Sequence, residues 1–202
     1  MSTNDRTTTQ KSPVPRAQRR PDKRAHRTRQ RLGIALVELM QEKSIDEVSV
    51  QEVLDRAAVG RSTFYLHFND KNDLLLSQLE MFLNTMSSML ILNNEKSHRV
   101  MPVAEMFDHI RSANKLYRAL GDAGRLNDFF DLAQTYFARG IRQRLADSNR
   151  LPHIPRRELA ARAAALAGCL ISLLQWWIGH EAKDSPQAMD NLFHKMVWTG
   201  LQ

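Results

Sequence analysis

Apolar residues recur at steps of three and four along most of this chain, which is the spacing of helices that bury one face. The first stripe consists of Leu32, Ala35, Leu36, Leu39 and Met40. The same spacing returns in a long run over 74–92 and then over 102–112, 114–120, 126–147, 156–181 and 186–200. Only eight Gly and seven Pro interrupt the 202 residues. The pattern therefore predicts an all-α protein of about nine helices.

Two short helical patterns follow each other closely in the stretch VLDRAAVGRSTFYLHF. The residues SVQE at its start fit a capping box, so we expect a helix over 50–57. Gly60 can serve as turn residue and N-cap of the second helix, in which Phe64 and Phe68 share one face. A helix this short is unstable alone, so the two rings should pack against a scaffold while the polar face meets a partner. The spacing is that of a helix-turn-helix.

Positive charge collects at the beginning of the chain. The formal net charge is +7, and residues 1–31 hold ten Lys or Arg against two Asp, which leaves the remainder near −1. We expect a flexible basic arm over 1–21, a helix-turn-helix domain over 22–72 and a larger helical domain over 73–202. A basic segment before a nearly neutral body suggests an anionic partner, either nucleic acid or a membrane surface.

The residue types that carry catalysis or bind metals are scattered. The seven His form no motif with metal-ligand spacing, no phosphate-binding loop is recognisable, and Cys169 lies alone in an apolar run. We therefore expect no enzyme, no metal and no cofactor other than a small-molecule effector of unknown identity. With no internal disulfide possible and no apolar run that reads as a membrane span, we expect a cytoplasmic protein without a membrane partner.

The stretch from Arg31 to Leu75 resembles the DNA-binding domain of the TetR family of bacterial transcriptional regulators. It contains RLGIALVELMQEKSIDEVSV, the helix-turn-helix quoted above and DKNDLL. The residues that fall in the family pattern are Thr63, Phe64, Tyr65, His67, Phe68, Lys71 and Leu74. The resemblance implies an N-terminal three-helix DNA-binding domain followed by a larger helical ligand-binding and dimerisation domain.

Three positions depart from the family pattern. Ala58 stands where Gly is usual, Gly60 where Ser or Thr is usual, and Ser44 where Gly commonly ends the first helix. If the turn keeps the family geometry, Ala58 must adopt a left-handed conformation, which costs on the order of 1 kcal/mol.

The predicted DNA-binding residues are Arg27, Thr28, Arg61, Ser62, Thr63, Tyr65, Leu66, His67 and Lys71. Arg61 can pair bidentately with guanine, and its alternative role is that of a solvated surface cation. Leu66 points away from Phe64 and either touches a thymine methyl or packs against the arm or the first helix.

The resemblance implies the remaining contacts. Ser62 would face the bases, and Thr63, Tyr65 and His67 would contact phosphate or sugar, although Tyr65 and His67 could be purely structural. Lys71 would hold a phosphate at the start of the next helix. Arg27 and Thr28 would meet the backbone near the start of the first helix. The arm would follow phosphates, enter a minor groove, or act only as a solubilising tail.

The last two helices, about 156–181 and 186–200, carry apolar stripes: Ala160, Ala164, Ala167, Leu170, Leu174 and Trp177, then Leu192, Phe193, Met196 and Val197. The resemblance implies that they form a homodimer interface, and the alternative is an intramolecular core. The family commonly encloses an effector pocket, but no residue of this sequence is assigned to one.

These observations predict a sequence-specific DNA-binding transcriptional regulator, and the resemblance implies a repressor released from a near-palindromic operator by a small-molecule effector. One alternative is a ligand-independent or architectural DNA-binding protein. Another is a membrane-surface or protein-interaction module that uses the basic arm.

Overall fold

The structure is a computed structural model that describes residues 23–148 and 154–199, so the arm predicted over 1–21 lies outside it. Within the described residues all regular structure is helical, which confirms the all-α prediction. The elements are α1 (Lys23–Met40), η1 (Ile45–Glu47), α2 (Val50–Ala57), α3 (Arg61–Tyr65), α4 (Lys71–Leu92), α5 (Val103–Ser112), α6 (Asn114–Asp122), α7 (Leu126–Ala146), α8 (Arg156–Gly179) and α9 (Pro186–Thr199).

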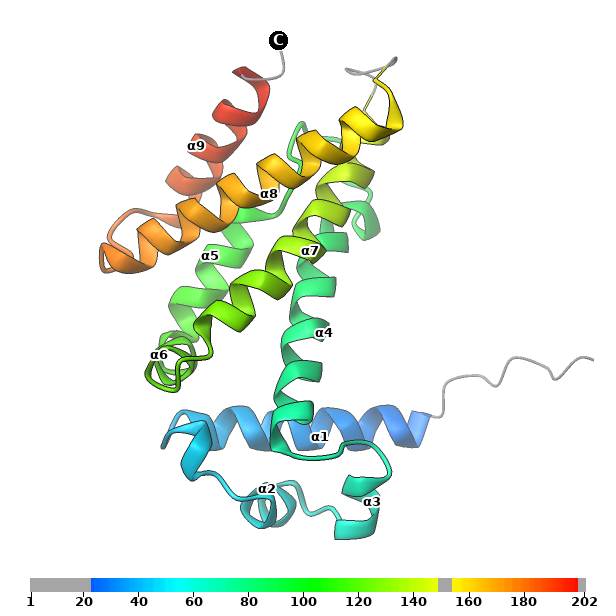
Figure 1. Ribbon diagram of the computed structural model, residues 1–202, viewed down its shortest axis with the longest axis vertical. Helices are drawn as coiled ribbons and strands as arrows, with labels where there is room; N and C mark the ends of the chain where they lie inside the picture. Colours follow the sequence, from blue (N-terminus) through cyan, green and yellow to red (C-terminus); the bar gives the residue numbers. More distant parts are fainter. Residues whose placement is uncertain (1–22, 149–153, 200–202) are drawn as a thin grey trace, which may run out of the picture.

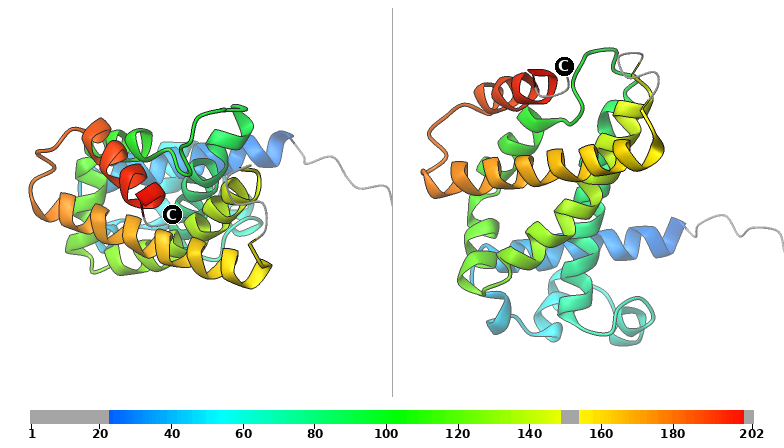
Figure 2. Two further views of the ribbon diagram at one scale, coloured as in Figure 1. Left: turned by 90° about the horizontal axis from the view of Figure 1, so that it is seen from above. Right: turned by 45° about the horizontal axis from the view of Figure 1, so that its top comes forward.

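The helices form a small lower unit and a larger upper bundle, joined by α4 (Figure 1). Helices α1, α2 and α3 make the lower unit, and the lower end of α4 packs on α1. The upper part of α4 packs on α7, which in turn lies along α8. Both views in Figure 2 show α9 beside α5 at the top of the bundle. Helix α4 therefore carries the main connection between the two parts, and α6 adds a smaller contact with α1.

The predicted apolar stripe of α1 forms the centre of the lower unit. Leu32, Leu36 and Met40 are at most 1% exposed, and they share their core with α2 and α4. The capping box of α2 is present, because Ser49 Oγ accepts from the Glu52 amide at 3.2 Å and the Ser49 amide donates to Glu52 Oε2 at 2.9 Å. Lys43, in the turn after α1, donates to Glu52 Oε1 at 2.6 Å. This hydrogen bond and the bonds with Ser49 lower the pKa of Glu52 to about 2.

Helices α4 and α7 approach closely at Gly140. A Cβ atom added there would lie 2.5 Å from the backbone oxygen of Ser87 on α4, a distance that real Cβ atoms do not reach. One residue earlier, Arg139 Nη2 donates to Asn84 Oδ1 at 2.8 Å. The absence of a side chain at Gly140 thus sets the spacing between the connecting helix and the bundle.

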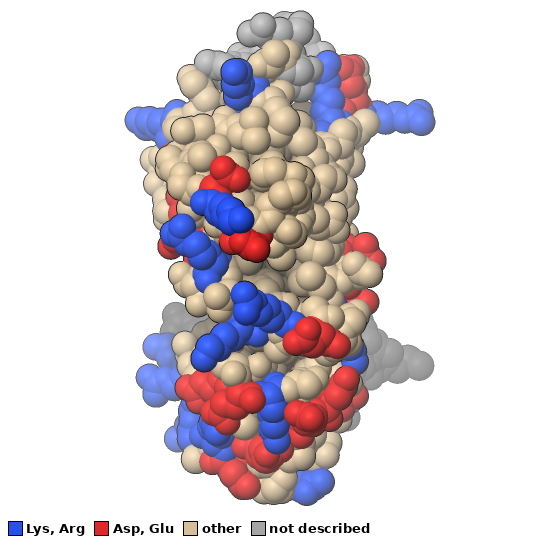
Figure 3. Space-filling model, turned by 90° about the vertical axis from the view of Figure 1, so that its left-hand side faces the viewer, with Lys and Arg blue, Asp and Glu red and all other residues tan. Residues whose placement is uncertain are grey.

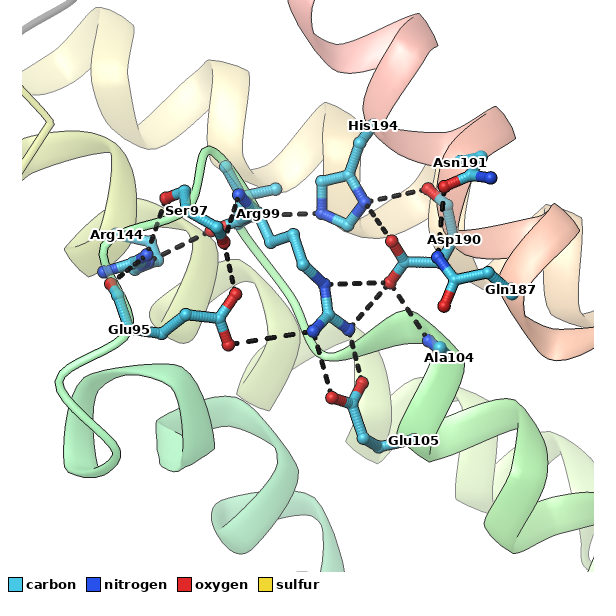
Figure 4. A network of polar contacts seen from close by, with 11 residues as sticks. Glu95, Ser97, Arg99, Ala104, Glu105, Arg144, Gln187, Asp190, Asn191 and His194 are labelled. Carbon is cyan, nitrogen blue, oxygen red and sulfur yellow. Dashed lines mark hydrogen bonds and ion pairs between the residues drawn. The ribbon is translucent and has the colours of Figure 1, made fainter.

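The loop between α4 and α5 is fixed to α7 and α9 by a polar network (Figure 4). Arg99 donates to Glu105 and to Asp190 of α9, whose Oδ1 also accepts from the Ala104 amide at 3.1 Å. Arg144 of α7 donates to three backbone carbonyls of the same loop. The network satisfies a nearly buried carboxylate and holds the end of α4 in place.

The stripe predicted on α8 for a dimer interface is divided between two environments. Ala167, Leu170, Leu174 and Trp177 are at most 1% exposed and pack in the core of their own chain, so the interface prediction is wrong for these four. Ala164, by contrast, is exposed. The helical spacing of the apolar residues was predicted correctly, but the apolar residues of α8 cover more of its circumference than one stripe.

Two helices, α4 and α8, are long and apolar enough to cross a membrane by length and composition alone. The expectation that no apolar segment has this length therefore needs correction. Core helices of water-soluble proteins meet the same criterion, so length and composition do not place either helix in a membrane.

Ala58 ends α2 in the left-handed conformation, with φ 48° and ψ 52°, as its place in the family pattern required. We predict that Ala58→Gly raises the free energy of unfolding by about 0.5–1 kcal/mol, because glycine adopts these angles without a Cβ clash. Urea denaturation would measure this change. The control Ala57→Gly, inside α2, should instead lower stability by about 1 kcal/mol or more. A destabilised Ala58→Gly variant would contradict the left-handed turn.

Candidate nucleic-acid interface

Helix α3 lies at the lower edge of the molecule (Figure 1), and four of its five residues are exposed. Phe64 and Phe68 point the other way, at 0% and 5% exposure, with their ring centres 5.9 Å apart. The predicted contact residues that are exposed on this segment are Arg61, Ser62, Thr63, Tyr65 and Leu66, and His67 is half-buried. The structure therefore places six of the nine predicted residues on one short segment.

The side chain of Arg61 is only lightly held. Its Nη1 donates to Gln51 Oε1 at 3.5 Å, the limit of a hydrogen bond, and its guanidinium lies 5.9 Å from the centre of the Tyr65 ring. Gln51 also donates to Asp55 at 2.8 Å. Such weak contacts orient the guanidinium over α3 and give way at little cost to a stronger bidentate acceptor.

Tyr65 and Leu66 place apolar surface on the same exposed face. Tyr65 is 50% exposed, and its ring meets Phe64 edge-on at 5.3 Å. Leu66 is 78% exposed, so neither α1 nor any other described residue covers it. Packing of Leu66 against the first helix is therefore excluded. Packing against the arm lies outside the described residues, and contact with a thymine methyl stays a prediction.

Lys71 has a role that differs from the predicted phosphate contact. Its Nζ donates to the carbonyls of Ile45, Asp46 and Val48 at 2.7–2.9 Å. An ammonium has three hydrogens, and these carbonyls use all of them. Lys71 thus fastens the η1 segment to the start of α4. No sequence pattern signals this role, because the three acceptors are backbone atoms more than twenty residues away.

Charge is polarised along α1. Its first half contains Lys23, Arg24, Arg27, Arg29 and Arg31, and its first turn has no acidic residue. Cations near the positive end of a helix dipole raise the free energy of the folded state, and a nearby anion reverses this effect. Arg27 is exposed and Thr28 is half-buried at this end. Acidic side chains gather instead over the lower unit where α1 ends (Figure 3).

Residues 35–77 match the model of the family described as bacterial regulatory proteins, tetR family. The helix-turn-helix domain of this chain belongs to the TetR family. The match begins inside α1, covers α2 and α3, and ends in the first turns of α4. It thus includes every exposed residue of the α3 segment described above. A comparison with curated protein sequences finds no significant match.

Solved structures of regulators share the fold of nearly the whole chain. A TetR transcriptional regulator from Streptococcus agalactiae is 20% identical, with a TM-score of 0.57, over 87% of this chain and 96% of its own. The dihydroxyacetone kinase operon activator DhaS is 14% identical, with a TM-score of 0.65, over 86% and 95%. The fatty acid degradation regulator FadR from Bacillus halodurans is 16% identical, with a TM-score of 0.58, over 86% and 99%. The upper bundle therefore also has the fold of these regulators.

The three carbonyl contacts of Lys71 generate a test that separates structure from DNA binding. We predict that Lys71→Met lowers the free energy of unfolding by about 1–3 kcal/mol and leaves the slope of log affinity against log salt unchanged. The matched variant Arg27→Met should leave stability unchanged or raise it slightly, and should reduce that slope by about 0.9, the value for one lost phosphate contact. Urea denaturation and salt titrations of DNA binding measure both effects. A reduced salt slope for Lys71→Met would support the originally predicted phosphate contact.

Proposed function

We propose that this protein is a cytoplasmic, non-enzymatic transcriptional regulator that binds a near-palindromic operator as a homodimer. The observation that carries the proposal is the α3 segment, in which two buried phenylalanines anchor a family-type recognition helix. Its other face offers Arg61, Ser62, Tyr65 and Leu66 to solvent. A helix of this kind enters the major groove, where side chains reach the edges of bases.

Each contact residue has a proposed role on DNA. Arg61 reads a guanine through two parallel hydrogen bonds, and Leu66 contacts a thymine methyl. Ser62 also faces the bases. Thr63, Tyr65 and His67 hold phosphate or sugar, as do Arg27 and Thr28 at the positive end of α1. The basic arm of residues 1–21 adds affinity that depends on salt more than on sequence.

The homodimer is proposed through the outer faces of α8 and α9. From residue 163 to residue 179 the sequence of α8 contains no charged residue, although only one side of it is buried. Its exposed positions include Ala161, Ala164, Ala165, Ser172 and Trp176. On α9, Leu192 and Met196 are 42% and 39% exposed. Small residues let a second copy approach closely, and the dimer places two recognition helices about 34–36 Å apart on the DNA.

The proposed regulation is release of DNA when a small molecule binds the upper bundle. The proposal of a repressor rests on the family resemblance, whereas DhaS, which shares the fold, is described as an activator. A ligand-independent architectural protein would bind DNA without a preferred site. A membrane-surface module would bind anionic vesicles and no DNA.

Selection of bound fragments from genomic DNA, followed by footprinting, tests the proposal. We predict one protected near-palindrome, and Arg61→Ala should weaken binding to it by about 1–3 kcal/mol while changing affinity for random DNA much less. Arg61→Lys is the matched control, because it keeps the positive charge but lacks the paired donors. It should retain random-DNA affinity and lose preference at the same base. Equal losses on both DNAs would remove Arg61 from base reading.

The dimer proposal has its own test. We predict that Ala164→Glu gives a folded monomer that binds the full operator poorly, because the carboxylate would be buried without a partner between subunits. Ala167→Glu should instead unfold the chain, since Ala167 is 0% exposed within its own subunit. Thr135→Glu, on the exposed side of α7, is the control and should stay dimeric. Sedimentation and circular dichroism distinguish these outcomes, and a dimeric Ala164→Glu would place the interface elsewhere.

A further inference from the structure

A cleft of about 490 Å³ opens between α5, α6, the start of α7 and the end of α8. The apolar part of its lining consists of Ile110, Tyr117, Leu126, Trp177 and Ile178. Its volume lies in the range of small-molecule sites, and its two aromatic rings suit a flat apolar ligand. The cleft belongs to the upper bundle and is separate from the DNA-binding face.

Tyr117 is the polar group that distinguishes this lining. Its side chain is 7% exposed, and its ring is held edge-on to Phe129 at 5.4 Å. No described residue hydrogen-bonds to its hydroxyl. Every fully buried polar side-chain atom in the described residues has a partner, so an unpartnered hydroxyl cannot be fully buried. The hydroxyl therefore reaches the open space of the cleft. Burial raises the pKa of Tyr117 well above its ordinary value, so the group stays protonated and is available as a donor.

The other polar groups of the cleft offer little to a charged ligand. Arg111 is paired with Asp108 at 2.7 Å, and Glu181 is paired with Lys183 at 2.9 Å. Trp177 already donates its indole N–H to the Asp184 carbonyl at 2.9 Å.

Asn114, Arg118 and Asp122 remain, all on α6 and all lining the cleft. Asn114 is uncharged, and the opposite charges of Arg118 and Asp122 favour neither an anion nor a cation. A charge at the buried end of the cleft would also lose its hydration with only one hydroxyl to replace it.

We propose that this cleft binds an uncharged aromatic molecule whose buried end presents an oxygen acceptor, such as a carbonyl, to the hydroxyl of Tyr117. The inference rests on the proposed ligand response of the regulator and assigns that response a site and a ligand class. Helix α6, which forms one wall of the cleft, also packs on α1. Immediately after it, Arg125 donates to Asn72 of α4 at 3.2 Å. Occupancy of the cleft is thereby placed one helix away from the DNA-binding domain.

Three naphthalene probes test the ligand class with the full chain by titration calorimetry. Acetylnaphthalene carries a neutral carbonyl, ethylnaphthalene has nearly the same shape without the acceptor, and naphthoate carries a negative charge. We expect Tyr117→Phe to weaken acetylnaphthalene binding about three- to tenfold, the loss of one hydrogen bond, and to leave ethylnaphthalene binding unchanged. Tyr136→Phe is the matched control, because Tyr136 lies on α7 outside the cleft and stacks with Arg139. It should bind all probes as the wild type does.

A second variant tests the location of the site without touching Tyr117. Gly121 lines the cleft, and a Cβ added there meets no atom within 4 Å, so Gly121→Leu should fill the cleft without disturbing the fold. We expect it to weaken every probe more than tenfold while circular dichroism stays unchanged.

Several results would overturn the inference: acetylnaphthalene failing to bind the wild type at its solubility limit, binding wild type and Tyr117→Phe equally, or binding Gly121→Leu undiminished. Naphthoate binding tenfold more tightly than acetylnaphthalene would overturn the uncharged class. DNA binding is measured on the same samples. A chain that binds the probes as expected but binds no DNA would refute the proposed function and leave the cleft assignment standing.

Discussion

The burial of Phe64 and Phe68 in the hydrophobic core is the interaction on which the DNA-binding face depends. A five-residue helix cannot stay formed in water by its own hydrogen bonds, so its geometry must come from the surface behind it. The two rings supply that surface and fix which side chains remain outside. Arg61 and Leu66 are exposed because Phe64 is not. Lys71 contributes from the other side by fastening η1 to the start of α4.

The connecting helix α4 packs against both parts of the molecule and holds them together. Its lower end packs on α1, and its upper end meets α7 where Gly140 allows backbone contact. The Arg99 network then fixes the loop that follows α4 to α9, and Arg125 joins the start of α7 to the start of α4. These contacts connect the upper bundle to the lower unit through closely packed helices, which deform little.

Helix α8 serves two surfaces at once, which explains its unusual composition. One side carries large residues such as Leu170 and Trp177 into the core, and the other carries alanines and Trp176 outward. A helix that is apolar on both sides but buried on one needs a further partner, and a second subunit is the proposed one. The same apolar composition gives α8 the hydropathy of a membrane span. The proposed subunit interface and the resemblance to a membrane span therefore have one physical origin.

The sequence by itself determined the helical class, the helix positions to within a few residues and the capping box at Ser49. These features follow from local spacing and local backbone chemistry, which a single segment contains in full. Only the tertiary structure decided the role of Lys71, the partition of α8 into core and outer face, and the cleft around Tyr117. Each depends on groups that the fold brings together from distant segments. Backbone carbonyls and the empty space of a cleft leave no periodic pattern in the sequence.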